Sequence, residues 1–137
     1  MKTIVIGYDD TEASGRALER AAQIATAFGS KVIVTSVAPV LIAAARGGGM
    51  IDPVDGVEEH QTQLQHAKEQ LAAKGIDAEI VPGVGDPAQT IVQVADEKSA
   101  DLIVVGTREP GILDRLLRGS VSQSVSRHAH CDVLVVH

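Results

Sequence analysis

The sequence lacks tryptophan and has only two aromatic residues, Tyr8 and Phe28. Proteins that bind single-stranded nucleic acid stack bases on aromatic side chains. The net charge of −6 also disfavours contact with phosphate backbones and with anionic membrane surfaces. We therefore expect no nucleic-acid partner and no membrane partner. The hydrophobic core must come from Val, Ile, Leu and Ala within the 45% of residues that are hydrophobic.

There is one cysteine, Cys131, so no disulfide can form within the chain. We interpret it as a small buried hydrophobic residue between a helix and a strand. No apolar run approaches the roughly 20 residues that a membrane-spanning helix needs. Asp9 and Asp10 interrupt the first apolar run too early for a signal peptide. These absences predict a cytoplasmic protein, and the length predicts one domain over residues 1–137.

Short apolar runs alternate with helical patterns along the whole chain. The runs predict strands at residues 3–8, 31–37, 77–84, 101–106 and 133–136, and the patterns between them predict helices. Strands that are apolar at every position are typical of a parallel sheet that is covered on both faces. We therefore predict an α/β fold, a doubly wound five-stranded parallel sheet with helices on both faces.

The helical patterns carry start and stop signals. Gly29 and Gly75 are expected to end the first two helices, the second of which begins near Val57. Asp86 and Pro87 start the third helix, and Ser120 with Gln123 fits a capping box for the last. The residues predicted to face the core are Ala17, Leu18, Ala21, Ile24, Ala25 and Phe28, then Val57, Leu64, Ala67 and Leu71, then Ile91, Val92, Val94 and Ala95.

A doubly wound sheet binds ligands at the carboxyl ends of its strands, where the strand order reverses. Tyr8 and Asp9 follow the first strand, and Gly106 follows the fourth. Asp9 is either a carboxylate that accepts hydrogen bonds from ribose hydroxyls or a turn residue. Residues 119–122 open a helix whose N–H groups and hydroxyls suit a phosphate. The alternative for that segment is a capped helix after a tight turn.

Three other patterns are weaker indications of a functional site. The sequence GVGDPA at residues 83–88 matches the dinucleotide pattern G-x-G-x-x-A, but its Asp-Pro pair is explained as a helix start. A phospho-accepting receiver domain needs an aspartate at the end of the third strand, where residues 81–83 read VPG. The rings of His128 and His130 are not expected to point the same way beside Cys131. We expect no metal site and no catalytic residue.

Three stretches together resemble the universal stress protein family along essentially the whole chain. They are the first strand with Asp9, ADLIVVG at residues 100–106 and GSVSQSVSRHAHCDVLVV at residues 119–136. The family usually has Cys-Pro before its last strand, where this chain has Cys131 and Asp132. The resemblance implies the strand order 3-2-1-4-5 and a homodimer formed through the C-terminal strand.

The nucleotide-binding branch of this family carries G-x-x-G, nine residues, and then Gly-Ser or Gly-Thr. Gly106, the nine residues 110–118 and the Gly119-Ser120 pair fit, whereas Glu109 stands in place of the second glycine. The resemblance implies that Tyr8 and Asp9 contact ribose and base, that Val37 meets adenine through its backbone, that Val105 and Gly106 flank the nucleoside, and that Gly119, Ser120, Val121 and Ser122 hold phosphates.

The ligand implied by the resemblance is ATP, ADP or AMP, with Mg²⁺ as an accompanying ion. The implied function is a stress-response homodimeric module or switch that binds the nucleotide, with at most slow hydrolysis. One alternative is a dimeric interaction module with a vestigial site, and another is a slow ATPase. The Glu109 carboxylate within ~4 Å of a phosphate would cost about 1–4 kcal/mol, so we expect weakened ATP binding and a smaller effect on AMP or ADP.

Overall fold

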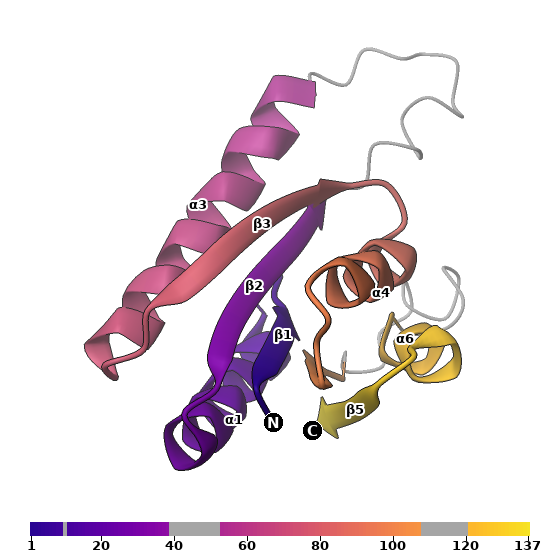
Figure 1. The fold of residues 1–137 in the computed structure, drawn as a ribbon. Helices are drawn as coiled ribbons and strands as arrows, with labels where there is room; N and C mark the ends of the chain where they lie inside the picture. Colours follow the sequence, from indigo (N-terminus) through magenta and orange to yellow (C-terminus); the bar gives the residue numbers. More distant parts are fainter. Residues whose placement is uncertain (10, 39–52, 108–120) are drawn as a thin grey trace.

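The computed structural model describes residues 1–9, 11–38, 53–107 and 121–137. Its elements are β1 (Thr3–Gly7), α1 (Glu12–Phe28), β2 (Lys31–Ala38), α3 (Pro53–Ala73), β3 (Ala78–Val84), α4 (Pro87–Glu97), β4 (Leu102–Gly106), α6 (Val121–His128) and β5 (Asp132–Val136). All five strands are parallel and form one sheet in the order β3-β2-β1-β4-β5 (Figure 1). The predicted fold class and strand order are therefore confirmed.

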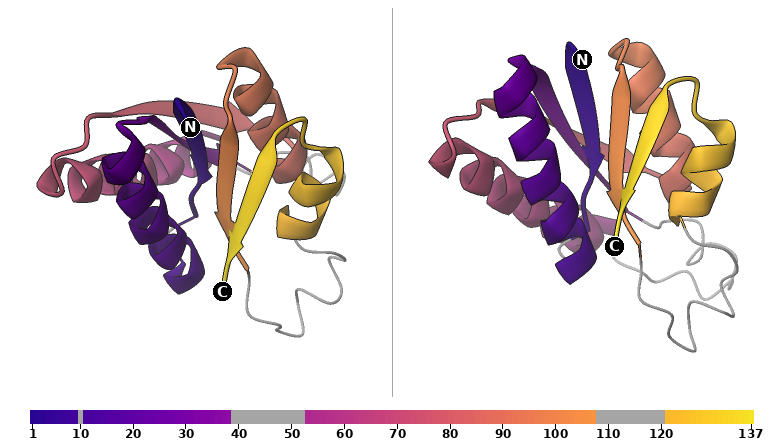
Figure 2. Two further views of the ribbon diagram at one scale, coloured as in Figure 1. Left: turned by 60° about the horizontal axis from the view of Figure 1, so that its bottom comes forward. Right: turned by 90° about the horizontal axis from the view of Figure 1, so that it is seen from below.

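Two helical layers cover the sheet, α1 and α3 on one face and α4 and α6 on the other (Figure 2). On the α1/α3 face the core contains Ile4, Ile6, Leu18, Val32, Val34, Leu64, Leu71 and Val104. On the α4/α6 face it contains Val5, Ile33, Ile91, Val94, Ile103 and Val125. Successive strand residues point to opposite faces. Because helices cover both faces, the inner strands are apolar at almost every position.

The helix ends follow the predicted local chemistry. Gly29 adopts the left-handed conformation with φ 66° at the end of α1, and Gly75 does so with φ 81° beyond α3. Both positions suit glycine because a Cβ disfavours that region. At α4 the Asp86 side chain accepts a hydrogen bond from the Gln89 N–H at 2.9 Å, and Pro87 occupies the first turn.

Two expectations about helices were wrong. Phe28 is 64% exposed, although the helical period places it on the buried face. It occupies the last turn of α1, at the amino-terminal rim of the sheet, where the chain reverses at Gly29 into β2. The helix expected to begin near Val57 begins at Pro53. The side chain of Val57 and the Ser120 cap lie outside the described residues.

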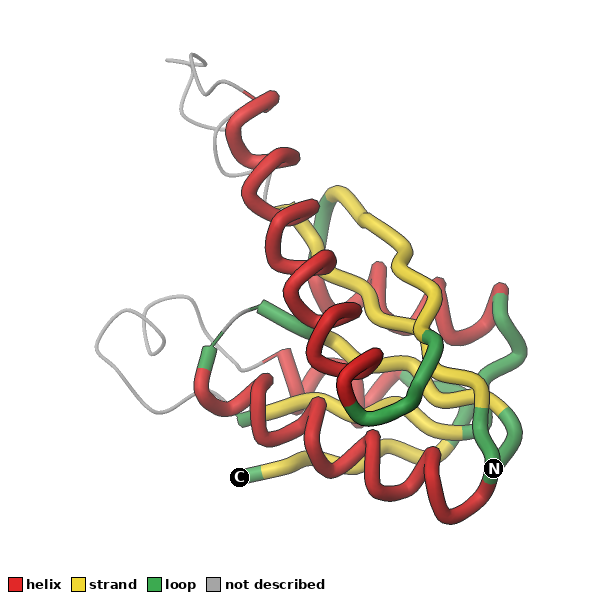
Figure 3. The backbone as a smooth tube through the Cα atoms, turned by 90° about the vertical axis from the view of Figure 1, so that its left-hand side faces the viewer, coloured by secondary structure: helices red, strands yellow, loops and turns green. Residues whose placement is uncertain are grey.

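Helix α3 is longer than the strands it covers. Figure 3 shows its amino-terminal part extending past the sheet. Its described buried side chains, Leu64, Ala67 and Leu71, all lie in the carboxyl-terminal half. Near its middle, Gln63 accepts a hydrogen bond from the Ser36 hydroxyl at 3.1 Å, which fixes α3 against the carboxyl-terminal part of β2.

The amino ends of β1 and β4 are joined by Asp101. Its Oδ2 accepts hydrogen bonds from the backbone N–H of Lys2 at 2.8 Å and of Thr3 at 3.0 Å. Its own N–H donates to the Thr3 carbonyl at 2.9 Å. The hydrogen bond from the Lys2 N–H and, to a smaller extent, that from the Thr3 N–H hold the pKa of the Asp101 carboxyl below its ordinary value.

Asp101→Asn should therefore lower the free energy of unfolding at neutral pH, and this deficit should shrink in acid. Since folding lowers the pKa of Asp101, its charge stabilises the fold above the ordinary pKa of 3.8, and the benefit is lost as pH falls through the folded-state value. Asparagine keeps an acceptor oxygen, so the comparison isolates the charge. Urea midpoints of both proteins at about pH 7 and about pH 3 test this, and a constant gap would contradict it.

Candidate functional site

The strand order reverses at β1. From β1 the chain runs through β2 and β3 toward one side of the sheet, and then returns to place β4 and β5 on the other. Gly7, near the end of β1, lies opposite Thr35 of β2 and Val105 of β4. The segments that follow β1 and β4 diverge at this point. Doubly wound sheets bind their ligands at such a point.

The predicted residues that the structure describes gather at this carboxyl edge. Tyr8 and Asp9 follow β1, and Val105 and Gly106 end β4. The backbone of Val37 lies in the last part of β2, paired with Gly83. Helix α6 starts on the same side with Val121 and Ser122, since it connects the end of β4 to the start of β5. Gly119, Ser120 and Glu109 lie outside the described residues.

Tyr8 is buried in the hydrophobic core. Its side chain is 5% exposed and belongs to the core on the α1/α3 face. Its backbone N–H donates to the Thr35 carbonyl at 3.0 Å, which continues the β1–β2 pairing by one residue. A contact between Tyr8 and a bound nucleotide stays a prediction.

Asp9 is held at both its backbone and its side chain by the start of α1. Its Oδ1 accepts hydrogen bonds from the Thr11 hydroxyl at 2.6 Å and from the Thr11 N–H at 3.1 Å. Its own N–H approaches the Ser14 hydroxyl oxygen at 3.4 Å. The Ser14 N–H donates to Thr11 Oγ1 at 3.2 Å, and the Ser14 hydroxyl donates to the Thr11 carbonyl at 3.0 Å. The start of α1 therefore fixes the Asp9 carboxylate, and a contact between this carboxylate and ribose hydroxyls stays a prediction.

Gly106 is required by packing. A Cβ on this residue would lie 2.5 Å from the carbonyl carbon and the carbonyl oxygen of Ala13, and 2.9 Å from its Cβ. The first turn of α1 therefore rests directly on the backbone at the end of β4. This contact holds Asp9 and Gly106 on the same edge, because Asp9 is bonded to that turn.

The start of α6 is anchored in the core. Ser122 is 5% exposed, and its carbonyl accepts a hydrogen bond from the Ser126 hydroxyl at 2.8 Å. Val121 packs against the core on the α4/α6 face. At the same edge of the sheet, the Thr107 N–H donates to the Val136 carbonyl at 2.9 Å and joins the carboxyl ends of β4 and β5. Backbone N–H groups at a helix start suit an anion, as expected for Val121 and Ser122.

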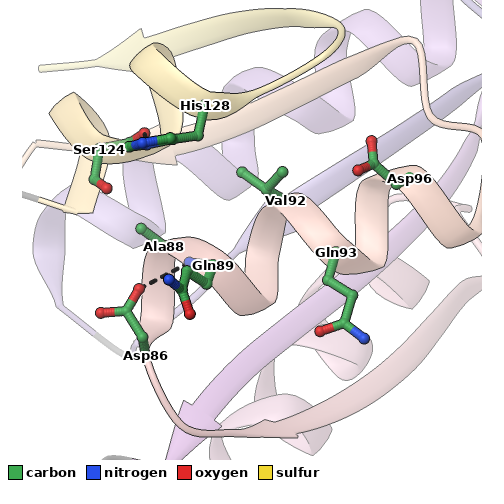
Figure 4. A pocket seen from close by; sticks show the side chains of 8 residues that line it. All are labelled: Asp86, Ala88, Gln89, Val92, Gln93, Asp96, Ser124 and His128. Carbon is green, nitrogen blue, oxygen red and sulfur yellow. Dashed lines mark hydrogen bonds between the residues drawn. The ribbon is translucent and has the colours of Figure 1, made fainter.

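A separate groove of about 410 Å³ lies between α4 and α6 (Figure 4). Ala88 and Val92 point from α4 toward Ser124 and His128 of α6. The remaining lining residues are Asp86, Gln89, Gln93 and Asp96. The two carboxylates make this groove unsuitable for a phosphate. The Asp86 capping bond also supports reading residues 83–88 as a helix start.

The two histidines and the cysteine near the end of α6 contact different groups. His128 Nδ1 lies 2.9 Å from the Ser124 carbonyl, and His130 Nδ1 lies 3.1 Å from Asp96 Oδ1. Burial and, to a smaller extent, the negative charge of Asp132 raise the pKa of the Cys131 thiol, so the thiol is protonated at neutral pH. In the described ranges, no three His, Cys, Asp or Glu residues come close enough to hold a metal.

None of the helices in the described part of the chain is long and apolar enough to cross a bilayer.

Sequence reasoning did not find the parts of the site contributed by Thr11, Ala13 and Ser14. One signal was present: Asp9-x-Thr11 directly before a helical pattern is typical of a turn followed by an N-cap. The contact of Ala13 with Gly106 had no local signal, because the two residues belong to different elements and meet only through helix–sheet packing.

Comparisons with known proteins relate the chain to one family. The model of the universal stress protein family matches residues 1–137. The universal stress protein Rv1636 of Mycobacterium tuberculosis is 39% identical over 140 residues, covering 99% of this chain and 96% of that protein. A solved universal stress protein in complex with cAMP is 34% identical with a TM-score of 0.78, covering 99% of this chain and 97% of that one.

A second solved structure comes from Archaeoglobus fulgidus and is a universal stress protein in complex with dAMP. It is 27% identical with a TM-score of 0.77, covering 100% of this chain and 98% of that one. The match of the family model over residues 1–137 and the 39% identity to a full-length relative are sufficient for assignment. The chain belongs to the universal stress protein family.

Proposed function

We propose that this protein is a stress-response module that binds an adenine nucleotide at the carboxyl ends of β1 and β4. The observation that carries the proposal lies at the point where the strand order reverses: Gly106 packs against the first turn of α1, and the same turn holds the Asp9 carboxylate. Two relatives that match nearly the whole chain were solved with cAMP and with dAMP, which supports an adenine nucleotide as the ligand class.

The residues in this proposal have distinct roles. Asp9 accepts hydrogen bonds from the nucleoside, Val37 offers its backbone to adenine, and Tyr8, Val105 and Gly106 flank the nucleoside. Gly119, Ser120, Val121 and Ser122 hold the phosphates with N–H groups and hydroxyls. The module is a homodimer joined through β5, an edge strand. It acts as a binding module or switch with at most slow hydrolysis, and Mg²⁺ accompanies ATP.

A second function competes with this one. Glu109 replaces a glycine of the nucleotide pattern, which favours a dimeric interaction module with a vestigial site. A slow ATPase is the third candidate, and a metal requirement for turnover would distinguish it. Nucleotide binding separates the first two candidates directly, because only the binding module retains adenine.

The absorbance spectrum of freshly purified protein tests the proposal. The chain has no tryptophan and one tyrosine, so a bound adenine would dominate the spectrum near ~260 nm. We expect an adenine peak either as purified or after addition of nucleotide, and release of the ligand identifies its phosphate state. A bare spectrum after addition of ATP with Mg²⁺, together with no heat of binding by calorimetry, would establish the vestigial-site module instead.

Glu109→Gly should tighten ATP binding about fivefold or more, because it removes a carboxylate that would cost at least about 1 kcal/mol beside a phosphate. The effect on AMP should be smaller, since AMP carries fewer phosphates toward the loop. Titration calorimetry of both nucleotides against both proteins measures this, with AMP as the internal control. An unchanged or lower affinity for ATP would show that Glu109 does not face the phosphates.

A further inference from the structure

We infer that Thr11 is the positioning residue of the nucleotide site: its hydroxyl holds the Asp9 carboxylate in the orientation that receives the nucleoside. The inference rests on the proposed function and adds a residue outside the predicted site. Two donors of Thr11 meet the same oxygen, Asp9 Oδ1, at 2.6 Å and 3.1 Å. The hydroxyl bond is short, as expected when the acceptor is ionised.

The direction of each proton follows from the distances. Thr11 has one hydroxyl hydrogen and two acceptors within reach, Asp9 Oδ1 at 2.6 Å and the Ser14 hydroxyl oxygen at 3.3 Å. The shorter contact, to the carboxylate, takes the hydrogen, while Thr11 Oγ1 accepts from the Ser14 N–H at 3.2 Å. The Ser14 hydroxyl donates to the Thr11 carbonyl at 3.0 Å and presents its oxygen to the Asp9 N–H at 3.4 Å. The result is a set of bonds that links both the backbone and the carboxylate of Asp9 to the first turn of α1.

This arrangement selects which part of a nucleotide Asp9 can meet. An ionised carboxylate only accepts hydrogen bonds, and it repels phosphate oxygens. The donors of an adenine nucleotide are the ribose hydroxyls and the adenine amino group. A carboxylate accepts about four hydrogen bonds, so the two from Thr11 do not exhaust its capacity. Held in one orientation, it discriminates a ribose with hydroxyls from one without them.

A structural role of Thr11 is also present and must be separated from positioning. As the N-cap of α1, Thr11 accepts a hydrogen bond through Oγ1, whereas it positions Asp9 by donating one. Glycine at an N-cap costs only a few tenths of a kcal/mol relative to threonine. Thr11→Gly therefore removes the hydroxyl donor, keeps the weaker backbone N–H donor and leaves the helix start nearly intact. Thr11→Ser keeps both donor and acceptor and is the matched control.

The first readout is the preference for AMP over 2′,3′-dideoxy-AMP, measured by calorimetry. Hydrogen bonds to a carboxylate predict a preference of about tenfold or more in the wild type and in Thr11→Ser. In Thr11→Gly the preference should fall to about threefold or less, because the carboxylate loses its short hydroxyl bond and one backbone N–H alone holds its orientation more loosely. An unchanged preference in Thr11→Gly overturns the inference while leaving the proposed function standing.

The second readout needs no ligand. The NMR couplings of the Asp9 Cβ protons should report a single χ1 rotamer in the wild type and in Thr11→Ser, and averaged rotamers in Thr11→Gly. A single rotamer retained in Thr11→Gly would overturn the positioning role even if affinities change. Failure of the wild type to bind any adenine nucleotide would overturn the proposed function, and with it the role of Thr11 toward a ligand.

Discussion

Replacing Gly106 with alanine should lower the free energy of unfolding by about 3 kcal/mol, the upper part of the range for overpacking. The added Cβ would lie 2.5 Å from the carbonyl carbon and oxygen of Ala13. Since these are backbone atoms, the clash cannot be relieved by turning a side chain, and the start of α1 must move. Nucleotide affinity should fall as well, because the displaced turn carries the partners of Asp9.

Two other glycines serve as matched controls in the same urea titrations. A Cβ on Gly7 would lie 2.8 Å from Cδ1 of Ile91, the far end of a flexible side chain, so Gly7→Ala should cost only about 1 kcal/mol. A Cβ on Gly15 would meet nothing within 4 Å, and this residue lies inside α1. Gly15→Ala should stabilise the fold by about 0.5–1 kcal/mol. If Gly106→Ala cost no more than Gly7→Ala, the close packing of α1 on β4 would be disproved.

Thr35→Val should raise the free energy of unfolding by about 1–2 kcal/mol. Thr35 is 0% exposed, and its hydroxyl oxygen finds no hydrogen-bond partner within the described part of the chain. It faces the core beneath α4 and α6, because its neighbour Val34 faces the opposite core. Valine has nearly the same shape and removes the penalty of a buried, unpaired hydroxyl.

Thermal unfolding measures this change, and Ile33→Val supplies the reference. Ile33 points to the same face of β2, two residues earlier, and is also fully buried. Losing its methylene should cost about 0.5–1.5 kcal/mol, so the two valine variants should shift the melting temperature in opposite directions. A lower melting temperature for Thr35→Val would mean that the hydroxyl is hydrogen-bonded in solution, for example to a buried water.

The parts of the fold that were predictable from sequence are those with local chemical signals. Gly29 and the Asp86-Pro87 pair fixed the ends of two helices, and continuous apolar runs identified all five strands. Residues that needed knowledge of packing were missed. Phe28 obeys the helical period, yet it lies at the rim of the sheet, and periodicity does not report where a sheet ends.

The same division applies to the candidate site. Its proposed location follows from parallel topology, because the carboxyl ends of neighbouring parallel strands share an edge. The hydrogen bonds from Thr11 and Ser14 to Asp9 depend on side-chain orientations in one turn, and the Ala13–Gly106 contact depends on the height of a helix above a sheet. Neither quantity is encoded in a short window of sequence.

The two edges of the sheet differ in what they offer to another chain. β3 forms one edge, and its Pro82 has no N–H to donate, while Glu79 carries ion pairs to Lys31 and Lys98. β5 forms the other edge, and residues 132–136 contain no proline. A pair of chains joined through β5 would use the open edge of each copy and present only the β3 edges outward. Assembly of that kind is self-limiting, because a fibre requires an open edge on both sides of every subunit.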